Sequence, residues 1–254
     1  MLKCVSHASK VLSAGLALGL MAVAPANAAG DKPAWSYEGS TGPENWGKLS
    51  PDYAACAIGA QQSPVDLTGA VEAYPAMPSV HWRTMPLRVK NNGHTLDVIA
   101  APGSFMMLGT VLYELVQFHF HTPSEHVLEG QTFPMEIHFV HRSEAGDLAV
   151  LGVFVMEGAA NSALEPIWAL MPKEPGEASS ATLIRPTDLL PDDGALDRYA
   201  GSLTTPPCSE IVTWSVYLEP IEASSAQIAA FSQLFGANAR PIQASDRRFL
   251  LRSD

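Results

Sequence analysis

Three histidines in two short stretches of this chain have the spacing of a metal site. His119 and His121 lie in QFHFHTPSEH, and His138 lies in MEIHFVH. Successive side chains of an extended strand point to opposite faces, so His119 and His121 would share one face and the neighbouring phenylalanines the other. Three imidazoles from two strands predict one Zn2+ ion per chain, in the three-histidine catalytic arrangement that leaves a fourth position for water. Strand histidines that are merely hydrogen-bonded are the alternative.

Two polar residues stand two positions before a predicted ligand, on the same strand face. Gln117 precedes His119, and Glu136 precedes His138. A ligating histidine usually donates its second ring N–H to an acceptor, which fixes its tautomer and orientation, and both residues suit that task. Glu136 has a second interpretation as a direct ligand. We favour the orienting role, because a carboxylate ligand would make the metal a weaker Lewis acid.

The elements that must position these histidines are mostly strands. Residues 104–155 are dominated by β-branched and aromatic residues between glycine and proline breaks, which predicts three or four consecutive strands. The sequence NNG at 91–93 is typical of a turn between two further strands, with His94 directly after it. Both histidine stretches fall within residues 104–155.

Helix signals are few. Residues 161–171 predict a short helix, and residues 224–235 predict a better one, with a serine cap and a glycine stop. Residues 35–49 predict an irregular arm packed by its tryptophans, and residues 172–194, with four prolines, predict a loop. The chain is therefore expected to form one mainly β (α+β) domain with short helices on its surface.

The N-terminal residues 1–28 have the pattern of a secretory signal peptide. Two lysines precede an apolar core at 11–23, and Ala-Asn-Ala at 26–28 forms a cleavage site. The apolar core is too short to cross a bilayer, and no later run is long enough. We expect an exported protein, periplasmic or secreted, whose folded domain covers residues 29–254.

Charge and cysteine content limit the partners further. The formal charge of −11 would fall by two, to −13, with the loss of the two signal lysines, so nucleic acid and anionic membranes are not expected partners. Cleavage would also remove Cys4. Cys56 and Cys208 then remain as a pair in a disulfide-permissive compartment, and we expect them to be bridged. Two free buried thiols are the alternative.

A series of separated motifs resembles the α-class carbonic anhydrases of the exported bacterial type. The motifs occur in the order GPENWGKL, QSPVDL, NNGHT, QFHFHTPSEH, EIHFVH, LAVLGVF, GSLTTPPCSEIVTW and NARPIQ, and they extend over essentially the whole mature sequence. The resemblance implies a single domain on a large twisted mixed sheet, mostly antiparallel, with short peripheral helices. It also implies a zinc enzyme, monomer or homodimer, that reversibly hydrates carbon dioxide to bicarbonate and a proton.

The resemblance further implies roles for single residues. It matches the three histidines to the zinc ligands, and Gln117 and Glu136 to the residues that orient them. Thr204 with Glu125 is similar to the pair that orients the zinc-bound hydroxide. His94 resembles the proton shuttle, and an unperturbed histidine pKa of about 6.5 suits proton exchange at neutral pH. Cys56 and Cys208 match the disulfide of exported members.

The remaining matches concern the pocket. The apolar wall for carbon dioxide is expected at Val140, Val150 and Leu203, with Trp214 behind it. Thr205 is similar to a residue near bound bicarbonate. Tyr37 and Asn92 match positions that hold the water chain to the shuttle. One position departs, because Asp97 stands where many relatives have asparagine. The departure puts the hydrogen bonding and charge of the water chain in question.

Two other functions use the same residues. A cupin-type iron or manganese oxygenase would bind metal through His119, His121 and Glu125, but the PxG-containing second cupin motif is missing around His138. A non-catalytic relative of the carbonic anhydrases would have lost a zinc ligand, whereas all three histidines are present. The other histidines are expected to be packing or hydrogen-bonding residues: His81, His126 and His141.

Overall fold

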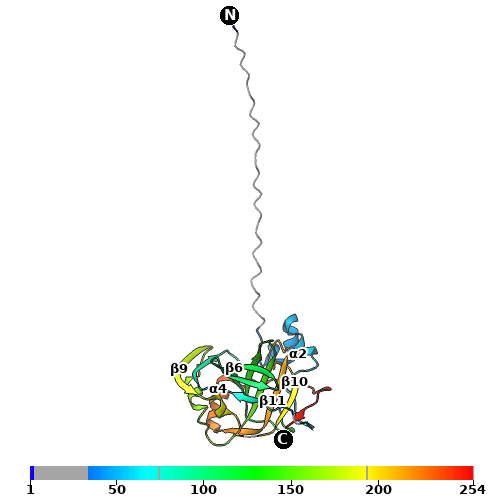
Figure 1. Cartoon of the computed structure of the whole chain (residues 1–254), viewed down its shortest axis with the longest axis vertical. Coiled ribbons are helices and arrows are strands. Elements are labelled where there is room, and N and C mark those ends of the chain that lie inside the picture. The colour runs from blue at the N-terminus through cyan, green and yellow to red at the C-terminus, as the bar shows by residue number, and fades with distance from the viewer. Residues whose placement is uncertain (3–33, 74, 193, 254) are drawn as a thin grey trace. The chain divides into compact units, whose positions relative to one another are not determined.

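The structure is a computed structural model that describes residues 1–2, 34–73, 75–192 and 194–253 (Figure 1). The predicted signal peptide lies outside the described residues, apart from the first two, so its cleavage stays a prediction. In the described ranges no helix is both long and apolar enough to span a membrane.

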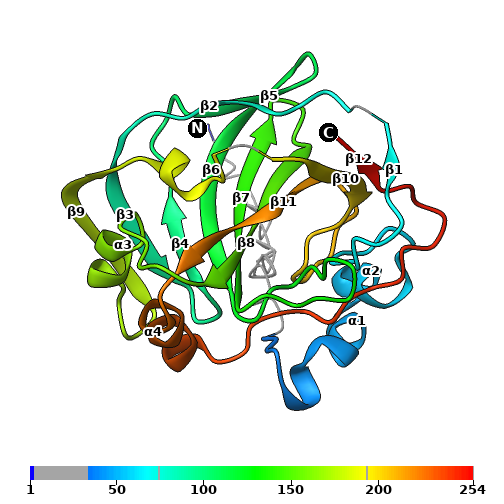
Figure 2. The ribbon, with the colours of Figure 1, turned by 90° about the horizontal axis from the view of Figure 1, so that it is seen from below.

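One large mixed sheet carries the fold (Figure 2). Its strands lie in the order β1-β12-β10-β11-β8-β7-β6-β4-β3-β9, with β5 paired to β6 and β2 paired to β5. Neighbours are antiparallel except in the pairs β1–β12 and β8–β11. The strands are β1 (Val71–Glu72), β2 (Ser79–His81), β3 (Met85–Asn91), β4 (Leu96–Ile99), β5 (Phe105–Leu108), β6 (Val111–His121), β7 (Met135–Ser143), β8 (Leu148–Glu157), β9 (Gly176–Ile184), β10 (Leu196–Gly201), β11 (Val212–Ala223) and β12 (Leu251–Arg252). The predicted mainly β, mixed and mostly antiparallel architecture is confirmed.

The centre of the sheet brings the three histidines together. Four strands, β5 to β8, form in the block predicted at residues 104–155, and β8 continues two residues beyond it. β6 pairs with β7 so that His119 lies directly opposite His138. On β8 the residue opposite His138 is Gly152. A Cβ atom there would lie 3.1 Å from Oε1 of Glu136, so the glycine leaves room for that carboxylate.

The opposite face of β6 belongs to the main core. Phe118 and Phe120 are fully buried, and the Phe120 ring lies 4.7 Å from that of Trp168 and 5.8 Å from that of Phe231. Burial of such a side chain contributes about 1.5–3 kcal/mol. The alternation of histidine and phenylalanine along β6 therefore anchors the strand on one side and presents imidazoles on the other.

Trp168 and Phe231 come from the two longer helices, α3 (Glu165–Leu170) and α4 (Ser225–Phe235), which lie together in Figure 2. Helix α4 begins at a capping box, in which Ser224 Oγ accepts from the Gln227 N–H while the Gln227 side chain accepts from the Ser224 N–H. It ends at Gly236, whose φ of 66° favours glycine. Both predicted helices are confirmed, although α3 is shorter than expected.

The remaining helices are single turns, and all but one of those in the described part of the chain lie between residues 39 and 58. They are η1 (Gly39–Thr41), η2 (Pro43–Asn45), α1 (Trp46–Leu49), η3 (Pro51–Tyr53), α2 (Ala55–Ile58) and η4 (Pro186–Leu189). Trp46 is fully buried, its ring lies 5.2 Å from that of Trp35, and its indole N–H donates to the carbonyl oxygens of Ser36 and Thr41. The arm is therefore packed by its tryptophans, as predicted.

The prediction of a loop over residues 172–194 is wrong in part. Strand β9 lies within it, at the edge of the sheet, and pairs antiparallel with β3. Most β9 side chains are exposed and small, so the segment lacks the apolar alternation that predicts strands. Its backbone is extended because it completes the hydrogen bonding of β3, a partner about 90 residues earlier in the chain.

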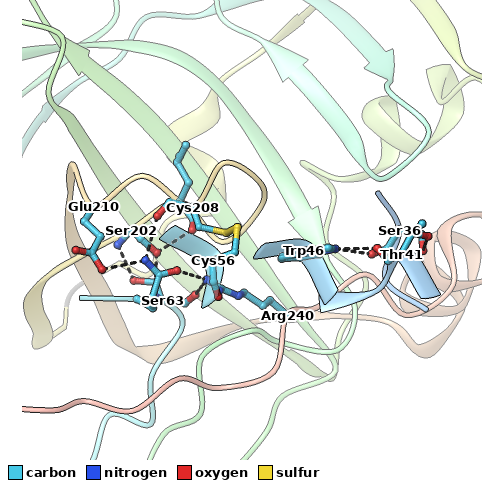
Figure 3. Close-up of a disulfide and its surroundings, with 11 residues drawn as sticks. Ser36, Thr41, Trp46, Cys56, Ser63, Ser202, Cys208, Glu210 and Arg240 are labelled. Atoms are coloured by element: carbon cyan, nitrogen blue, oxygen red, sulfur yellow. Dashed lines mark hydrogen bonds between the residues drawn. A yellow bond between two sulfur atoms is a disulfide. The ribbon is translucent and has the colours of Figure 1, made fainter. Parts of the chain in front are cut away.

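A disulfide joins Cys56 in α2 to Cys208 in the loop between β10 and β11, and so confirms the predicted pairing (Figure 3). The two Cα atoms lie 5.1 Å apart although the residues are 152 positions apart in sequence. The Gln62 amide donates to the Cys208 carbonyl, and Arg240 donates to the Cys56 carbonyl. The disulfide thus ties α2 to the loop that carries Thr204.

Candidate metal centre

Three imidazole rings converge on one point at the face of β6 and β7. His121 and His138 are each 1% exposed, and His119 is half-buried. One ring nitrogen from each of the three lies within 4.8 Å of the others. Such a cluster from two paired strands is what the histidine spacing predicted.

Each histidine is held by an acceptor on its other nitrogen. His119 Nδ1 lies 2.9 Å from Gln117 Oε1, His121 Nδ1 lies 2.8 Å from the carbonyl oxygen of Asn238, and His138 Nε2 lies 2.9 Å from Glu136 Oε1. Since these nitrogens must donate, the lone pairs remain on His119 Nε2, His121 Nε2 and His138 Nδ1. His121 Nε2 is buried and has no hydrogen-bond partner. The donor set therefore fits a metal ion that prefers neutral nitrogen ligands, such as Zn2+.

Burial sets the protonation of two of these rings. It holds the pKa of His119 well below the ordinary value and also lowers the pKa of His121. The neutral ring is the form that offers a lone pair. For His138 burial acts in the same direction, but the charge and hydrogen bond of Glu136 outweigh it and raise the pKa. Glu136 thus makes His138 a more basic ligand.

Each carboxylate oxygen of Glu136 accepts two hydrogen bonds. Its Oε2 accepts from the backbone N–H groups of Glu125 and His126, and its Oε1 accepts from the rings of His126 and His138. Burial favours the neutral acid, yet the charges and hydrogen bonds of these two histidines hold the pKa of Glu136 well below its usual range. Four donors leave no lone pair directed at a metal, so the geometry favours the orienting role over direct ligation.

A chain of hydrogen bonds continues from Glu136 into the core. His126 Nε2 lies 2.6 Å from the hydroxyl oxygen of Tyr199, and that hydroxyl donates to Ser63 Oγ over 2.9 Å. His126 is therefore a hydrogen-bonding residue, as predicted. His141 and His81 also match their predicted roles: His141 bonds Trp82 and Ala149, and the exposed His81 bonds Ser79.

Glu125 lies against the histidine cluster. Its Oε1 accepts from the backbone N–H of Arg240 over 2.8 Å. Its Oε2 lies 3.5 Å from His121 Nε2 and 3.8 Å from His138 Nδ1, is buried, and has no hydrogen-bond partner. Thr204 is buried in the loop after β10, but no hydrogen bond joins it to Glu125 in the described part of the chain.

A cavity of about 240 Å³ opens beside His119 and His121. Its lining contains six other residues singled out in the sequence: Tyr37, Asn92, His94, Asp97, Gln117 and Thr205. The His94 ring stacks on the indole of Trp35, with centroids 3.8 Å apart and planes 9° apart. Burial lowers the pKa of His94. The structure thus brings the predicted shuttle and water-chain residues to one cavity with the histidine cluster.

The predicted carbon dioxide wall forms a separate apolar cluster. Val150 and Trp214 are buried, and Val140 and Leu203 pack against them. The Trp214 ring lies 4.7 Å from the ring of His138, and its indole N–H donates to the carbonyl oxygen of Ser202. These four residues are therefore together and next to one predicted ligand.

Sequence reasoning missed two residues that hold the site. Asn238 is fully buried; besides accepting from His121, it donates to the carbonyl oxygens of His94 and Phe120. Arg240 holds Glu125 through its backbone and donates through its guanidinium to Gln62, Ser63 and Cys56. The motif NARPIQ contains both residues, but neither the spacing nor the residue types within it indicate which site they support.

Three histidine nitrogens without cysteine, beside a cavity, could hold one metal ion and are the donor set of one kind of catalytic zinc site. The profile of the family described as eukaryotic-type carbonic anhydrase matches residues 41–251. A carbonic anhydrase from Nostoc sp. (strain PCC 7120 / SAG 25.82 / UTEX 2576) is 44% identical over 85% of each chain, and one from Pectobacterium carotovorum is 39% identical over 91% of this chain and 96% of the relative.

Solved structures agree with the sequences. The α-carbonic anhydrase of Thermovibrio ammonificans, in complex with sulfanilamide, superposes with a TM-score of 0.84 at 44% identity, covering 86% of this chain and 99% of that one. The chain therefore belongs to the α-carbonic anhydrase family and is an enzyme that hydrates carbon dioxide. The cupin alternative fails, because cupins are double-sheet jelly rolls.

Proposed function

We propose that this chain holds one Zn2+ ion on His119, His121 and His138 and uses it to interconvert carbon dioxide and bicarbonate. The observation that carries the proposal is the set of three inward lone pairs, each fixed by a different acceptor on the far side of its ring. When bound by three neutral ligands, zinc is a Lewis acid that lowers the pKa of its water to about 7, the value established for carbonic anhydrases as a family.

Thr204 and Glu125 would orient the attacking oxygen. Support comes from Glu125 Oε2, a buried acceptor without a partner that lies within 4 Å of two of the histidine nitrogens. If the Thr204 hydroxyl donates its proton to this oxygen, the threonine oxygen can only accept from the nucleophile. The nucleophile must then donate its O–H to the threonine oxygen, and this orientation directs a lone pair of the nucleophile towards the carbon of the substrate. Arg240 holds the opposite oxygen of Glu125 in place.

Carbon dioxide would rest against the apolar cluster of Val140, Val150 and Leu203, with Trp214 behind it. An apolar wall suits a neutral substrate and offers no hydrogen bond to the anionic product. Thr205 lines the cavity and would meet bicarbonate there. Product is then released towards water through the cavity.

The proton would leave through the same cavity. Tyr37, Asn92 and His94 line it, and the His94 ring stacks on Trp35 at the turn after β3. A volume of about 240 Å³ accommodates several water molecules, since each occupies roughly 30 Å³ in the liquid. A water chain in the cavity would carry the proton to the imidazole, which passes it to buffer.

Export belongs to the same proposal. Residues 1–28 would be removed, and the mature domain would begin at Ala29 in the periplasm or outside the cell. The Cys56–Cys208 disulfide supports this placement, because such bonds persist in oxidising compartments. N-terminal sequencing of the protein recovered from the periplasm and the medium tests it. A mature protein retaining Met1 inside the cytoplasm would contradict export.

The decisive experiment combines metal analysis with a hydration assay. We expect one zinc per purified mature chain, loss of carbon dioxide hydration when a chelator removes it, and recovery when Zn2+ is returned. Stoichiometric iron, or full hydration activity without metal, would overturn the proposal. Sedimentation in the same preparation distinguishes monomer from homodimer.

A further inference from the structure

The amide of Gln62 lies between the disulfide and Arg240. Gln62 is 5% exposed and belongs to the motif QSPVDL, to which the proposed mechanism gives no role. Its amide nitrogen donates to the Cys208 carbonyl and to Glu210 Oε1, and its amide oxygen accepts from the Arg240 guanidinium, each over 3.0 Å (Figure 3). A carbonyl only accepts and a guanidinium only donates, so these partners fix which end of the amide faces each of them.

The nitrogen end of this amide holds the loop that carries Thr204. Inside the loop, the Leu203 N–H donates to the Ser209 carbonyl over 3.0 Å, and the Cys208 N–H donates to the Thr205 carbonyl over 2.9 Å. Thr204 lies between the ends of these two bonds, which keep the loop residues in place relative to one another. A hydrogen bond that holds the Cys208 carbonyl therefore also holds Thr204.

The oxygen end of the amide holds the residue that positions Glu125. The Arg240 guanidinium donates to Gln62 Oε1, and the backbone N–H of the same arginine donates to Glu125 Oε1 over 2.8 Å. Arg240 is 2% exposed and Glu125 is 1% exposed. One buried side chain thus connects, through single hydrogen bonds, the segments that carry the two members of the proposed orienting pair.

Gly59 leaves the space in which this amide lies. Its backbone angles, φ −64° and ψ 146°, are open to any residue. A Cβ atom there would nevertheless collide with Gln62 Nε2 and Glu210 Oε1. Glycine is therefore needed at this position for the close approach of the two side chains.

We propose that Gln62 is a positioning residue for the hydration step, which sets the distance between Thr204 and Glu125. The inference rests on the proposed function, in which that pair orients the nucleophile. Gln62 does not belong to the cavity lining, so it acts through the two segments that it joins. A misplacement of about 1 Å in a reacting group can cost about a hundredfold in rate, and the amide link limits such movement.

The variant Gln62→Glu separates the two ends of the amide. Its carboxylate still accepts from the guanidinium, but it no longer donates to the Cys208 carbonyl and faces Glu210 as a like charge. The loop that carries Thr204 loses its hydrogen bond, whereas the contact with the guanidinium remains. Gln61→Glu is the matched control, because it makes the same change at the preceding residue, which is exposed.

We expect Gln62→Glu to lower kcat/KM for carbon dioxide about tenfold at unchanged zinc content, because the nucleophile is less well oriented. Gln61→Glu should keep the wild-type value. Thr204→Ala leaves no hydroxyl to position, so adding Gln62→Glu to it should not lower kcat/KM further. A general loss of stability would lower kcat/KM by the same factor in both backgrounds, so the comparison isolates positioning.

Hydrogen exchange gives a measurement that does not depend on catalysis. We expect the backbone N–H groups of Leu203 and Cys208 to exchange faster in Gln62→Glu, while the Arg240 N–H keeps its wild-type rate, because only the loop end of the link is cut. Equal acceleration at all three groups would show general destabilisation and overturn the inference.

Glu210→Ala repeats the test at an exposed residue. It removes one acceptor of the Gln62 amide nitrogen and leaves Gln62 itself unchanged. We expect kcat/KM to fall about threefold in the wild-type background and to stay unchanged in Thr204→Ala. This variant decides the question if circular dichroism shows that Gln62→Glu does not fold.

The outcomes separate this inference from the proposed function. A wild-type protein that does not hydrate carbon dioxide, or a Thr204→Ala variant with wild-type kcat/KM, overturns both. Where Thr204→Ala is impaired as proposed, the role of Gln62 alone is overturned by wild-type kcat/KM in Gln62→Glu, by an equal loss in both backgrounds, or by a loss of zinc that accounts for the change. Where Gln62→Glu does not fold, an unchanged kcat/KM in Glu210→Ala, or an equal loss in both backgrounds, overturns it.

Discussion

At the residue scale, the three predicted ligands are held by acceptors of different chemistry. Gln117 offers an amide oxygen, Glu136 a carboxylate and Asn238 a peptide carbonyl. Only the carboxylate carries charge, and only His138 has its pKa raised. The neutral acceptors fix the ring orientation of the other two histidines and leave burial to keep them deprotonated.

His121 supplies the most enclosed of the free lone pairs. We expect His121→Ala to lower zinc affinity by more than about a hundredfold, because loss of an orienting partner alone costs about 10–100-fold. Competition with a chromophoric chelator measures the affinity. His81→Ala is the control, since His81 is exposed and bonded to Ser79. Equal zinc affinity in the two variants would contradict the ligand assignment.

His94 lies on the turn between β3 and β4, and the proposed mechanism makes it the residue that passes protons to buffer. We expect His94→Ala to reduce kcat about tenfold or more, with little change in kcat/KM, because proton transfer to buffer limits turnover and not the attack on substrate. Added imidazole should restore much of the loss. An unchanged kcat in dilute, non-imidazole buffer would make His94 an idle side chain.

Thr204 is buried, and no hydrogen bond joins it to its proposed partner Glu125 in the described part of the chain. Thr204→Ala should lower kcat about a hundredfold by leaving the nucleophile misoriented, while bound zinc stays stoichiometric. Thr204→Ser keeps the hydroxyl and should retain most of the activity. Near-normal turnover in the alanine variant would remove both Thr204 and Glu125 from the proposed mechanism.

At the scale of elements, the disulfide connects α2 to the loop that carries Thr204. In Figure 3 Arg240 and Ser63 lie beside this junction, and the Arg240 guanidinium donates a hydrogen bond to the Ser63 carbonyl oxygen. Strand pairing alone does not fix this loop, because it leaves β10 and returns to β11. A covalent tie and the Arg240 contacts therefore hold the position of a proposed catalytic residue.

Replacing both cysteines by serine should lower the free energy of unfolding by about 2–5 kcal/mol, since the unfolded chain regains the freedom of a long loop. The measurement is urea unfolding of the variant against the oxidised wild type. We also expect kcat to fall, because the Thr204 loop loosens. Equal free energies of unfolding in the variant and the wild type would mean that the hydrogen bonds around Arg240 hold the junction without the disulfide.

At the scale of the whole molecule, His141 links stability to pH. It is fully buried on β7; its Nδ1–H donates to the Ala149 carbonyl, and its Nε2 accepts from the Trp82 indole. Both bonds require the neutral ring, because a proton on Nε2 would face the Trp82 N–H. Burial lowers the pKa of His141 to about 4, although backbone hydrogen bonds oppose the shift.

The sign of the effect follows from proton binding. Unfolded His141 titrates near 6.5, so between pH 6.5 and about 4 the unfolded chain binds a proton that the folded chain excludes. The stability that depends on the neutral ring is complete above pH 6.5 and is lost as pH falls to about 4, by about 3 kcal/mol. Urea unfolding at several pH values should show this loss. His141→Gln should flatten that part of the profile, and an identical profile in the variant would contradict the assignment.

Local patterns in the sequence are enough to specify several features of this protein. Alternation along residues 117–121 decides which face carries histidines, and the cap and stop residues decide where α4 begins and ends. The predicted signal cleavage would leave two cysteines, which allow one pairing within the chain. The NNG turn likewise predicted the hairpin of β3 and β4. These properties depend on side-chain periodicity and backbone preference within a few residues.

Which distant groups meet is decided by the folded chain alone. The register of β6 against β7 sets His119 opposite His138, and the Asn238 carbonyl reaches His121 from 117 positions away. Strand β9 exists because β3 offers it a backbone edge, since its own side chains give no strand signal. The Asn92 amide that donates to Asp97 is itself held by the backbone N–H groups of His94 and Thr95. Such contacts follow from chain packing and hydrogen-bond satisfaction across the whole domain, which no local pattern specifies.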